Sequence, residues 1–248
     1  SRPLYRDAAG GVYRDPLIRP EKVNDYELGG SWRREDLSFS VNLFRMNFSD
    51  ELVYAGQFNT DLGYPILGNA ARSVHQGLEI AAAAERAYPR GVRLKFDGNA
   101  TLSDNHFVKY REVYGLTSAD TLRYDGNRIA LFPSVLAHAT LSASWAGARA
   151  GAQLNYAGRQ FVDNTASVVN SIGPTATLDL LASWRGPGTP PPAGTRRSTI
   201  ELLLRVTNAL DRRYATSGYM DYDAGGNLVP QFIPAATRGV NGQIRLDF

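Results

Sequence analysis

GVRLKFDGNATLS, residues 91–103, alternates apolar and polar side chains almost without error. Leu94 and Phe96 fall on one parity, and charged residues such as Arg93 and Asp97 fall on the other. Successive side chains of a β-strand point to opposite faces, so this pattern predicts a strand with one apolar and one polar face.

Eight further segments share this period of two, and no segment shows the period of a helix. They are residues 26–32, 37–48, 74–84, 135–145, 148–158, 176–184, 200–206 and 240–248. Within the second of these, the apolar parity slips between Leu43 and Phe44, which we interpret as a bulge or as a strand leaving a membrane. The sequence therefore predicts an all-β fold of about nine antiparallel strands, each of about 9 to 12 residues.

The composition excludes several classes of protein. The chain has 248 residues, no cysteine and a formal net charge of +3, so disulfide scaffolds, cysteine-ligated zinc sites and thiol nucleophiles are excluded. Its basic residues do not cluster along the chain, and no nucleic-acid partner is expected. The longest apolar runs have about five residues, far fewer than the ~20 that a membrane-spanning helix needs.

The connections between these segments alternate in length. Short connections follow Arg33, Arg86, Trp145 and Arg185, whereas long ones cover residues 53–71, 109–133, 163–174 and 209–238. Short turns on one side and long loops on the other are typical of an up-and-down transmembrane β-barrel. The alternative fold is a soluble β-sandwich, which has the same alternation of apolar and polar side chains.

The tryptophans favour the barrel. Trp32, Trp145 and Trp184 all fall on the apolar parity at short-turn ends, as an aromatic girdle at a membrane interface requires. Many other positions of the apolar parity are alanine, which lipid tolerates better than a dry protein core does. The chain also ends on Phe248, which closes an alternating strand, as terminal aromatic residues do in bacterial outer-membrane barrels.

Four segments, in order along the chain, resemble the C-terminal half of TonB-dependent outer-membrane receptors. They are RPEKVNDYELG at 19–29, RSVHQGLE at 72–79, GRQFVDNT at 158–165, and a closing set of NALDRRY at 208–214, IPAATR at 233–238 and LDF at 246–248. This resemblance implies a barrel of about 22 strands filled by a plug domain. It also implies that a siderophore, vitamin or similar chelate binds at the extracellular loops and is imported with energy that TonB supplies.

Nothing in the chain resembles a plug or a TonB box, and nine strands are too few for the barrel of this family. We therefore expect the chain to be the C-terminal portion of a receptor barrel, with residues 1–20 a remnant of an extracellular loop and residues 21–248 forming about nine strands. The expected location is the bacterial outer membrane. The expected partners are lipid and lipopolysaccharide, the barrel assembly machinery that reads Phe248, and TonB through the missing N-terminal part. A passive porin or an adhesin-type barrel is the alternative function.

The candidate ligand contacts are aromatic and arginine residues of the long loops, because aromatic faces and guanidinium groups suit a planar anionic chelate. They are Tyr54, Phe58, Tyr64, Tyr110, Arg111, Tyr114, Arg123, Tyr124, Tyr219 and Tyr222. An outer aromatic girdle, or contact with lipopolysaccharide phosphates, is the alternative role for them. His75 and His138 are expected to be polar residues of the lumen, with no metal site, no cofactor and no catalytic residue in the chain.

Overall fold

A computed structural model describes residues 5–6, 12–13, 19–59, 64–113, 121–187 and 199–247 of the chain. One 11-stranded sheet dominates it, and the only helical element in these residues is a short 3-10 turn, η1 (Pro89–Gly91). Within the described residues, no helix is long and apolar enough to cross a bilayer. The all-β fold that the alternation predicts is therefore confirmed.

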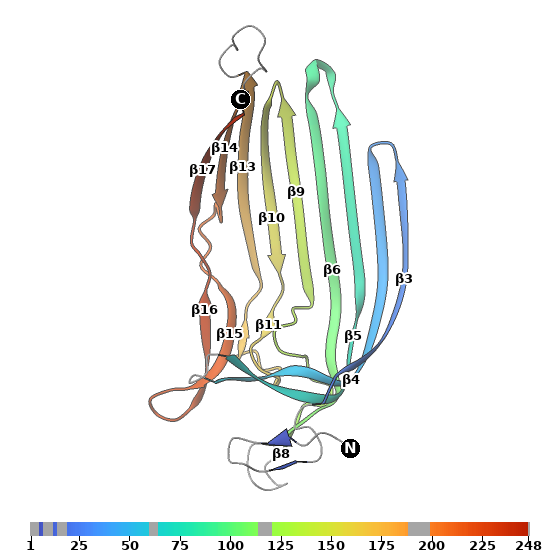
Figure 1. Ribbon diagram of the computed structural model, residues 1–248, viewed down its shortest axis with the longest axis vertical. Coiled ribbons are helices and arrows are strands. Elements are labelled where there is room, and N and C mark those ends of the chain that lie inside the picture. Colours follow the sequence, from blue (N-terminus) through green and yellow to red (C-terminus); the bar gives the residue numbers. More distant parts are fainter. Residues whose placement is uncertain are drawn as a thin grey trace.

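Nine strands of this sheet follow one another as antiparallel neighbours (Figure 1). They are β3 (Lys22–Arg34), β4 (Leu37–Asn59), β5 (Tyr64–Ala87), β6 (Arg93–Lys109), β9 (Val135–Trp145), β10 (Ala148–Ala157), β13 (Thr175–Pro187), β14 (Thr199–Thr207) and β17 (Gly239–Asp247). Each contains all or most of one of the nine alternating segments. The described sheet is open, with β3 pairing only β4 and β17 pairing only β14.

Short strand pairs lie before β3 and between later long strands, mostly where long loops are predicted. They are β1 (Tyr5–Arg6) with β2 (Val12–Tyr13), β7 (Arg111–Val113) with β8 (Thr121–Arg123), β11 (Gln160–Phe161) with β12 (Ser171–Ile172), and β15 (Ala215–Tyr222) with β16 (Leu228–Pro234). The β15–β16 hairpin also joins the main sheet, because Met220 pairs with Gln57 of β4.

The predicted loop over residues 53–71 is wrong, because β4 and β5 continue as a paired hairpin as far as Asn59 and Tyr64. These strands have 23 and 24 residues, about twice the predicted length. Their extension lies against residues far along the chain, including β15. Local periodicity cannot detect such support, since it comes from tertiary packing.

The parity slip in β4 is not a bulge. Pairing with β5 continues without a shift from Leu43, opposite Leu78, through Phe44, opposite Gly77, to Arg45, opposite Gln76. The two faces instead exchange polarity here: apolar side chains turn to the inner face, and Arg45 lies on the outer one. The second interpretation, a strand leaving the membrane, agrees with this exchange and stays a prediction.

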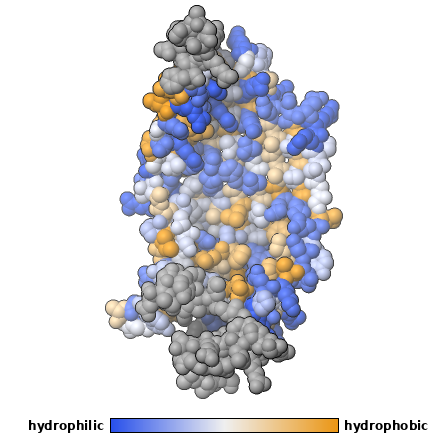
Figure 2. Space-filling model, viewed as in Figure 1, coloured by the Kyte–Doolittle hydropathy of each residue, from blue (hydrophilic) through white to orange (hydrophobic). Residues whose placement is uncertain are grey.

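Between the level of Leu43 and the short turns, the outer face is apolar and uncovered. Leu28, Val240 and Ile244 are each about 70% exposed, and no second sheet covers this face within the described residues. In Figure 2 hydrophilic residues dominate the short-turn end, and hydrophobic and hydrophilic residues mingle over the middle of the sheet. An uncovered apolar face is unlike a soluble β-sandwich, whose two sheets bury their apolar faces against each other.

The three tryptophans lie on this outer face near the short turns. Trp145 and Trp184 both pair with Ala148, so they flank one residue of β10. Trp32 pairs with Phe39, close to the turn between β3 and β4. All three side chains are partly exposed, at 51%, 60% and 41% for Trp32, Trp145 and Trp184. Their role as a membrane girdle stays a prediction.

The segment NALDRRY forms the turn that leaves β14. Asn208 and Asp211 both have positive φ, at 48° and 50°. The Asn208 side chain accepts a hydrogen bond from the Arg212 amide (2.9 Å) and donates one to the Arg212 carbonyl (2.9 Å). Asp211 accepts one from the amide of Arg238 (3.0 Å), which joins this segment to IPAATR. The two motifs therefore share one turn structure, because Asn and Asp tolerate the left-handed region and bond locally to the backbone.

Candidate functional site

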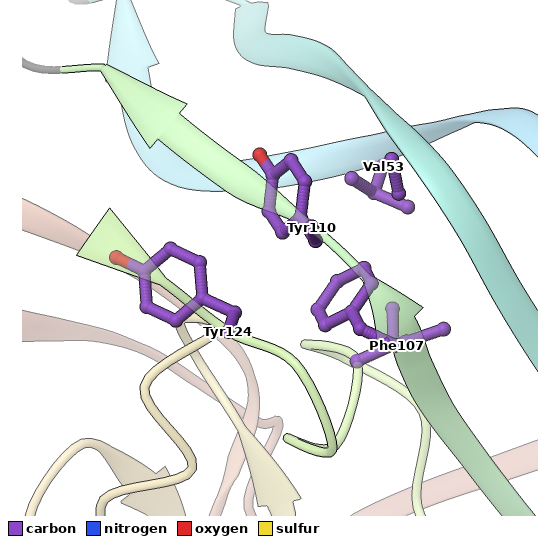
Figure 3. Close-up of a cluster of buried hydrophobic side chains, with 6 residues drawn as sticks. Val53, Phe107, Tyr110 and Tyr124 are labelled. Carbon is purple, nitrogen blue, oxygen red and sulfur yellow. The ribbon is translucent and has the colours of Figure 1, made fainter. Parts of the chain in front are cut away.

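The long-loop end of the sheet holds a buried apolar cluster, which we call the loop core (Figure 3). Its members come from β4, β5, β6 and the segment that follows β6: Val53, Ala70, Phe107, Tyr110, Tyr124 and Ile129. The ring centroids of Phe107 and Tyr110 are 4.6 Å apart, and those of Tyr110 and Tyr124 are 5.6 Å apart. Aromatic pairs at this distance, here tilted relative to each other, stabilise a loop beyond the burial of their area.

Asn164 connects this region to the loop after β11. Its Nδ2 donates a hydrogen bond to the Tyr54 carbonyl (2.7 Å), and its Oδ1 accepts one from the Ala130 amide (3.1 Å). Its own carbonyl accepts one from Asn127 Nδ2 (2.9 Å). Asn164 is only 2% exposed, so it acts as a buried connector of three segments.

A second apolar cluster joins the β15–β16 hairpin to the same assembly. Val162, Ile172 and Met220 form it. Gly218 lies so close that an added Cβ would come 2.7 Å from Val162 Cγ1. Gln160 Nε2 also donates to the Thr216 carbonyl (3.3 Å). Four long connections are thus interlocked at one end of the sheet.

A buried polar network lies on the inner face of the sheet at the same end. His75 Nε2 lies 2.8 Å from Glu51 Oε1, and His75 Nδ1 lies 2.9 Å from Asn105 Oδ1. Ser73 donates to Glu51 rather than to His75. The network therefore lacks the serine–histidine pair of a nucleophilic site, and no group of three acidic, histidine or cysteine side chains in the described residues has metal-binding geometry.

A cavity of about 380 Å³ lies on the inner side, and His138 is one of its lining residues. His138 Nδ1 is 2.8 Å from Asn155 Oδ1, and its Nε2 is 3.1 Å from Thr140 Oγ1. Gln160, Tyr214 and Thr216 also line this cavity. The structure thus places His138 beside open space, whereas His75 is buried at 6% exposure.

The predicted ligand contacts fall into distinct environments. Tyr110 and Tyr124 are buried in the loop core and expose almost no surface. Arg111 is exposed, and Tyr222 is 65% exposed near the tip of the β15–β16 hairpin. The Arg123 guanidinium lies 2.7 Å from Asp125, and hydrogen bonds from Arg123 and from the Tyr110 amide hold the pKa of Asp125 below its ordinary value.

Tyr54 and Tyr219 approach each other between β4 and β15. Burial, together with the nearby Tyr219 and Asp163, raises the pKa of Tyr54 to about 12. Its phenol oxygen is buried and has no hydrogen-bond partner within the described part of the chain. The side chains of Phe58 and Tyr64, and the whole of Tyr114 and Phe248, lie outside the described residues.

Sequence reasoning missed Asn164 and Glu51, two polar residues that organise this end. Asn164 lies in GRQFVDNT, and Glu51 lies between the predicted strand over 37–48 and the predicted loop over 53–71. The Asp-Asn pair of GRQFVDNT is a turn-forming signal that could have drawn attention to Asn164. No local signal marks Glu51.

A sheet of long antiparallel strands, apolar outside and polar inside, with interlocked loops at one end, is typical of part of a transmembrane β-barrel. Residues 2–209 match the family described as TonB dependent receptor-like, beta-barrel. The chain belongs to this family, as the resemblance of its four segments predicts.

Three known receptors illustrate the similarity. The pesticin receptor of Yersinia enterocolitica is 27% identical over 243 residues, which cover 96% of this chain and 31% of that receptor. The crystal structure of the ferric yersiniabactin uptake receptor FyuA from Yersinia pestis has a TM-score of 0.60 at 23% identity, covering 92% of this chain and 30% of that one. The siderophore receptor PiuA from Acinetobacter baumannii has a TM-score of 0.61 at 18% identity, over 92% and 28%. The chain thus spans about a third of the receptors it matches.

Proposed function

We propose that this chain is the C-terminal part of an outer-membrane receptor that captures a ferric siderophore or a similar chelate and imports it with energy from TonB. The interlocked loops over a polar inner face carry this proposal. They form a rigid rim above a cavity, as capture followed by passage requires. Relatives described as receptors for pesticin, ferric yersiniabactin and a siderophore support the ligand class.

The contacts in this proposal are Arg111 and Tyr222, which are exposed, and Tyr219, which is partly buried beside Tyr54. Arg111 presents an exposed guanidinium group, and Tyr222 presents an exposed ring. Such groups attract a chelate that is anionic and partly aromatic. Tyr110 and Tyr124 hold the loop core from within and act through their packing.

The remaining parts of the proposal concern the surroundings of the chain. It lies in the bacterial outer membrane, in contact with lipid and lipopolysaccharide, after insertion by the barrel assembly machinery. Residues 1–20 belong to an extracellular loop, and TonB acts through a part of the receptor outside this chain. The receptor transports its ligand and catalyses no reaction.

The test is uptake of ferric siderophores by bacteria that carry the whole receptor as their only route. Uptake is expected to require TonB, and replacement of both Arg111 and Tyr222 by alanine is expected to lower ligand affinity at least tenfold. Substitution of Arg34, an exposed residue at the short-turn end, is the matched control and should change neither affinity nor uptake. Uptake that persists without TonB would support the alternative, a passive porin.

A further inference from the structure

The outer face of β3, β4, β5 and β6 changes from apolar to cationic toward the long-loop end. Strand register places one residue from each strand in every row across this face. The last apolar row before the long-loop end is made entirely of leucine: Leu28, Leu43, Leu78 and Leu102. The row thus ends the apolar surface with four branched side chains that suit contact with acyl chains.

The next row toward the long loops carries a cation. It contains Tyr26, Arg45, Gln76 and Asp104. The Arg45 guanidinium donates to Gln76 Oε1 (2.6 Å) and Asn47 Oδ1 (3.2 Å), and it pairs with no carboxylate among the described residues. Asp104, the one acid of this row, lies 3.0 Å from His106 Nδ1 and accepts from Gln76. Arg45 therefore keeps an uncompensated charge.

Two rows further on lies what we call the cationic row: Lys22, Ser49, Arg72 and Lys109. Its three charged residues are exposed, and none of their side chains has an ion-pair or hydrogen-bond partner in the described parts of the chain. Two of the three lysines of the protein stand here. Neighbouring strands are about 4.8 Å apart, so like charges repel across this row unless an anion lies between them.

The spacing of the two cationic levels limits the kind of anion. Lys22 lies four residues from Tyr26, the β3 member of the Arg45 row, which is about 13 Å along the strand and about 10 Å in depth for a strand tilted by roughly 40°. A shallow, open groove of about 800 Å³ is lined by the leucine row and by Arg45. A phospholipid with a single phosphate could reach Arg45 but not also the cationic row. A lipid with phosphate groups at two depths fits both.

We propose that this face binds a phosphate-bearing glycolipid of the outer leaflet. One acyl chain lies in the groove, one phosphate lies on Arg45, and a second phosphate lies on Lys22, Arg72 and Lys109. Arg72 and Lys109 are adjacent across the sheet and contact the same phosphate, because guanidinium and ammonium groups bind phosphate oxygens by charge-assisted hydrogen bonds. This inference rests on the proposed membrane location.

The experiment measures lipid binding to the whole receptor, purified in detergent, by native mass spectrometry. The probes are a lipopolysaccharide that retains its phosphorylated inner core, the same lipid after enzymatic dephosphorylation, phosphatidylglycerol, and inorganic phosphate as competitor. The K22Q/R72Q/K109Q variant is expected to bind the phosphorylated glycolipid about 100-fold more weakly. The K22R/K109R variant, which keeps the charge of the cationic row, should retain binding. A triple glutamine variant at Arg33, Arg34 and Arg90 should bind as tightly as the unmodified receptor.

Three results would overturn the inference. They are equal binding by the unmodified receptor and the triple glutamine variant of the cationic row, unchanged binding after dephosphorylation, and equally tight binding of phosphatidylglycerol. Displacement by millimolar inorganic phosphate would show a simple anion site and would also overturn it. Membrane fractionation and siderophore uptake of the same variants separate this outcome from failure of the proposed function, since a receptor absent from the outer membrane contradicts both proposals.

Discussion

Asn164 Nδ2 donates a hydrogen bond to the carbonyl oxygen of Tyr54 at 2.7 Å, across 110 residues of sequence. The bond ties the end of β4 to the loop after β11, and Asn164 also accepts from the Ala130 amide. The rim of the barrel is therefore one connected body rather than a set of separate loops. A ligand that contacts one loop meets a surface held in place by the others.

Replacing Asn164 by alanine is expected to loosen this rim. The change leaves the Tyr54 carbonyl and the Ala130 amide without partners at a buried position, which costs about 2–4 kcal/mol of unfolding free energy. Hydrogen exchange of residues 121–134 and 158–174 should increase. The same substitution at exposed Asn24 is the control, and equal protection in both variants would contradict the role of Asn164.

The loop core and the exposed outer face predict very different losses of stability for two large-to-small substitutions. Phe107 is completely buried, so Phe107→Ala should lower the unfolding free energy by about 3–5 kcal/mol. Leu141 is 57% exposed on the outer face, and Leu141→Ala should cost less than about 1 kcal/mol in detergent. Urea unfolding in micelles measures both. Similar losses in the two variants would show that the loops do not form a packed core.

Asp179 and Arg205 form an ion pair on the inner face (3.2 Å). Removing Asp179 should cost more stability than removing Arg205. Arg205 is about half exposed, so its loss should cost under about 1 kcal/mol. Asp179 is more buried and also accepts from the amide of Asn208 (2.8 Å), so Asp179→Ala should cost about 1–3 kcal/mol and disturb the NALDRRY turn. Thermal unfolding compares the variants, and equal costs would argue against this second contact.

The tryptophan girdle predicts one depth for three side chains. Single-tryptophan versions that retain Trp32, Trp145 or Trp184 should be quenched most strongly by lipids brominated near the headgroup, because indole rings collect at that interface. Strong quenching of any of them by lipids brominated at the chain end would contradict the girdle.

Tyr54 predicts a change at alkaline pH. An unperturbed tyrosine ionises near 10, whereas Tyr54 in the folded protein ionises at about 12. Folding therefore favours the protonated phenol, and this contribution to stability is present below pH 10 and is lost as the pH rises to 12. The absorbance titration at 295 nm should lose its last step in Tyr54→Phe. A last step that is the same in both proteins would place the buried phenol elsewhere.

Much of the fold follows from local pattern. The nine strands are predictable because each segment by itself shows the period of two. The inner and outer faces of β6 follow from residues 91–103 alone. The position of each tryptophan near a short turn follows likewise. The resemblance of four segments correctly indicates the family. The positive φ of Asn208 and Asp211 explains why one of these segments, NALDRRY, forms a turn.

The arrangement of the rim could not be predicted in this way. Beyond Leu43 the two faces of β4 exchange polarity, so its alternation no longer marks the outer face. The sequence therefore predicts a loop from residue 53, where the strand in fact continues to Asn59. Tyr110 and Tyr124 look like surface aromatics in the sequence, and only packing against Phe107 shows them to be buried. Alternation within each strand therefore determines the sheet and its two faces, whereas contacts between residues as far apart as Tyr54 and Asn164 determine how the long loops are interlocked. Such contacts form only after distant segments have closed over the inner face, and no short stretch of sequence contains both partners.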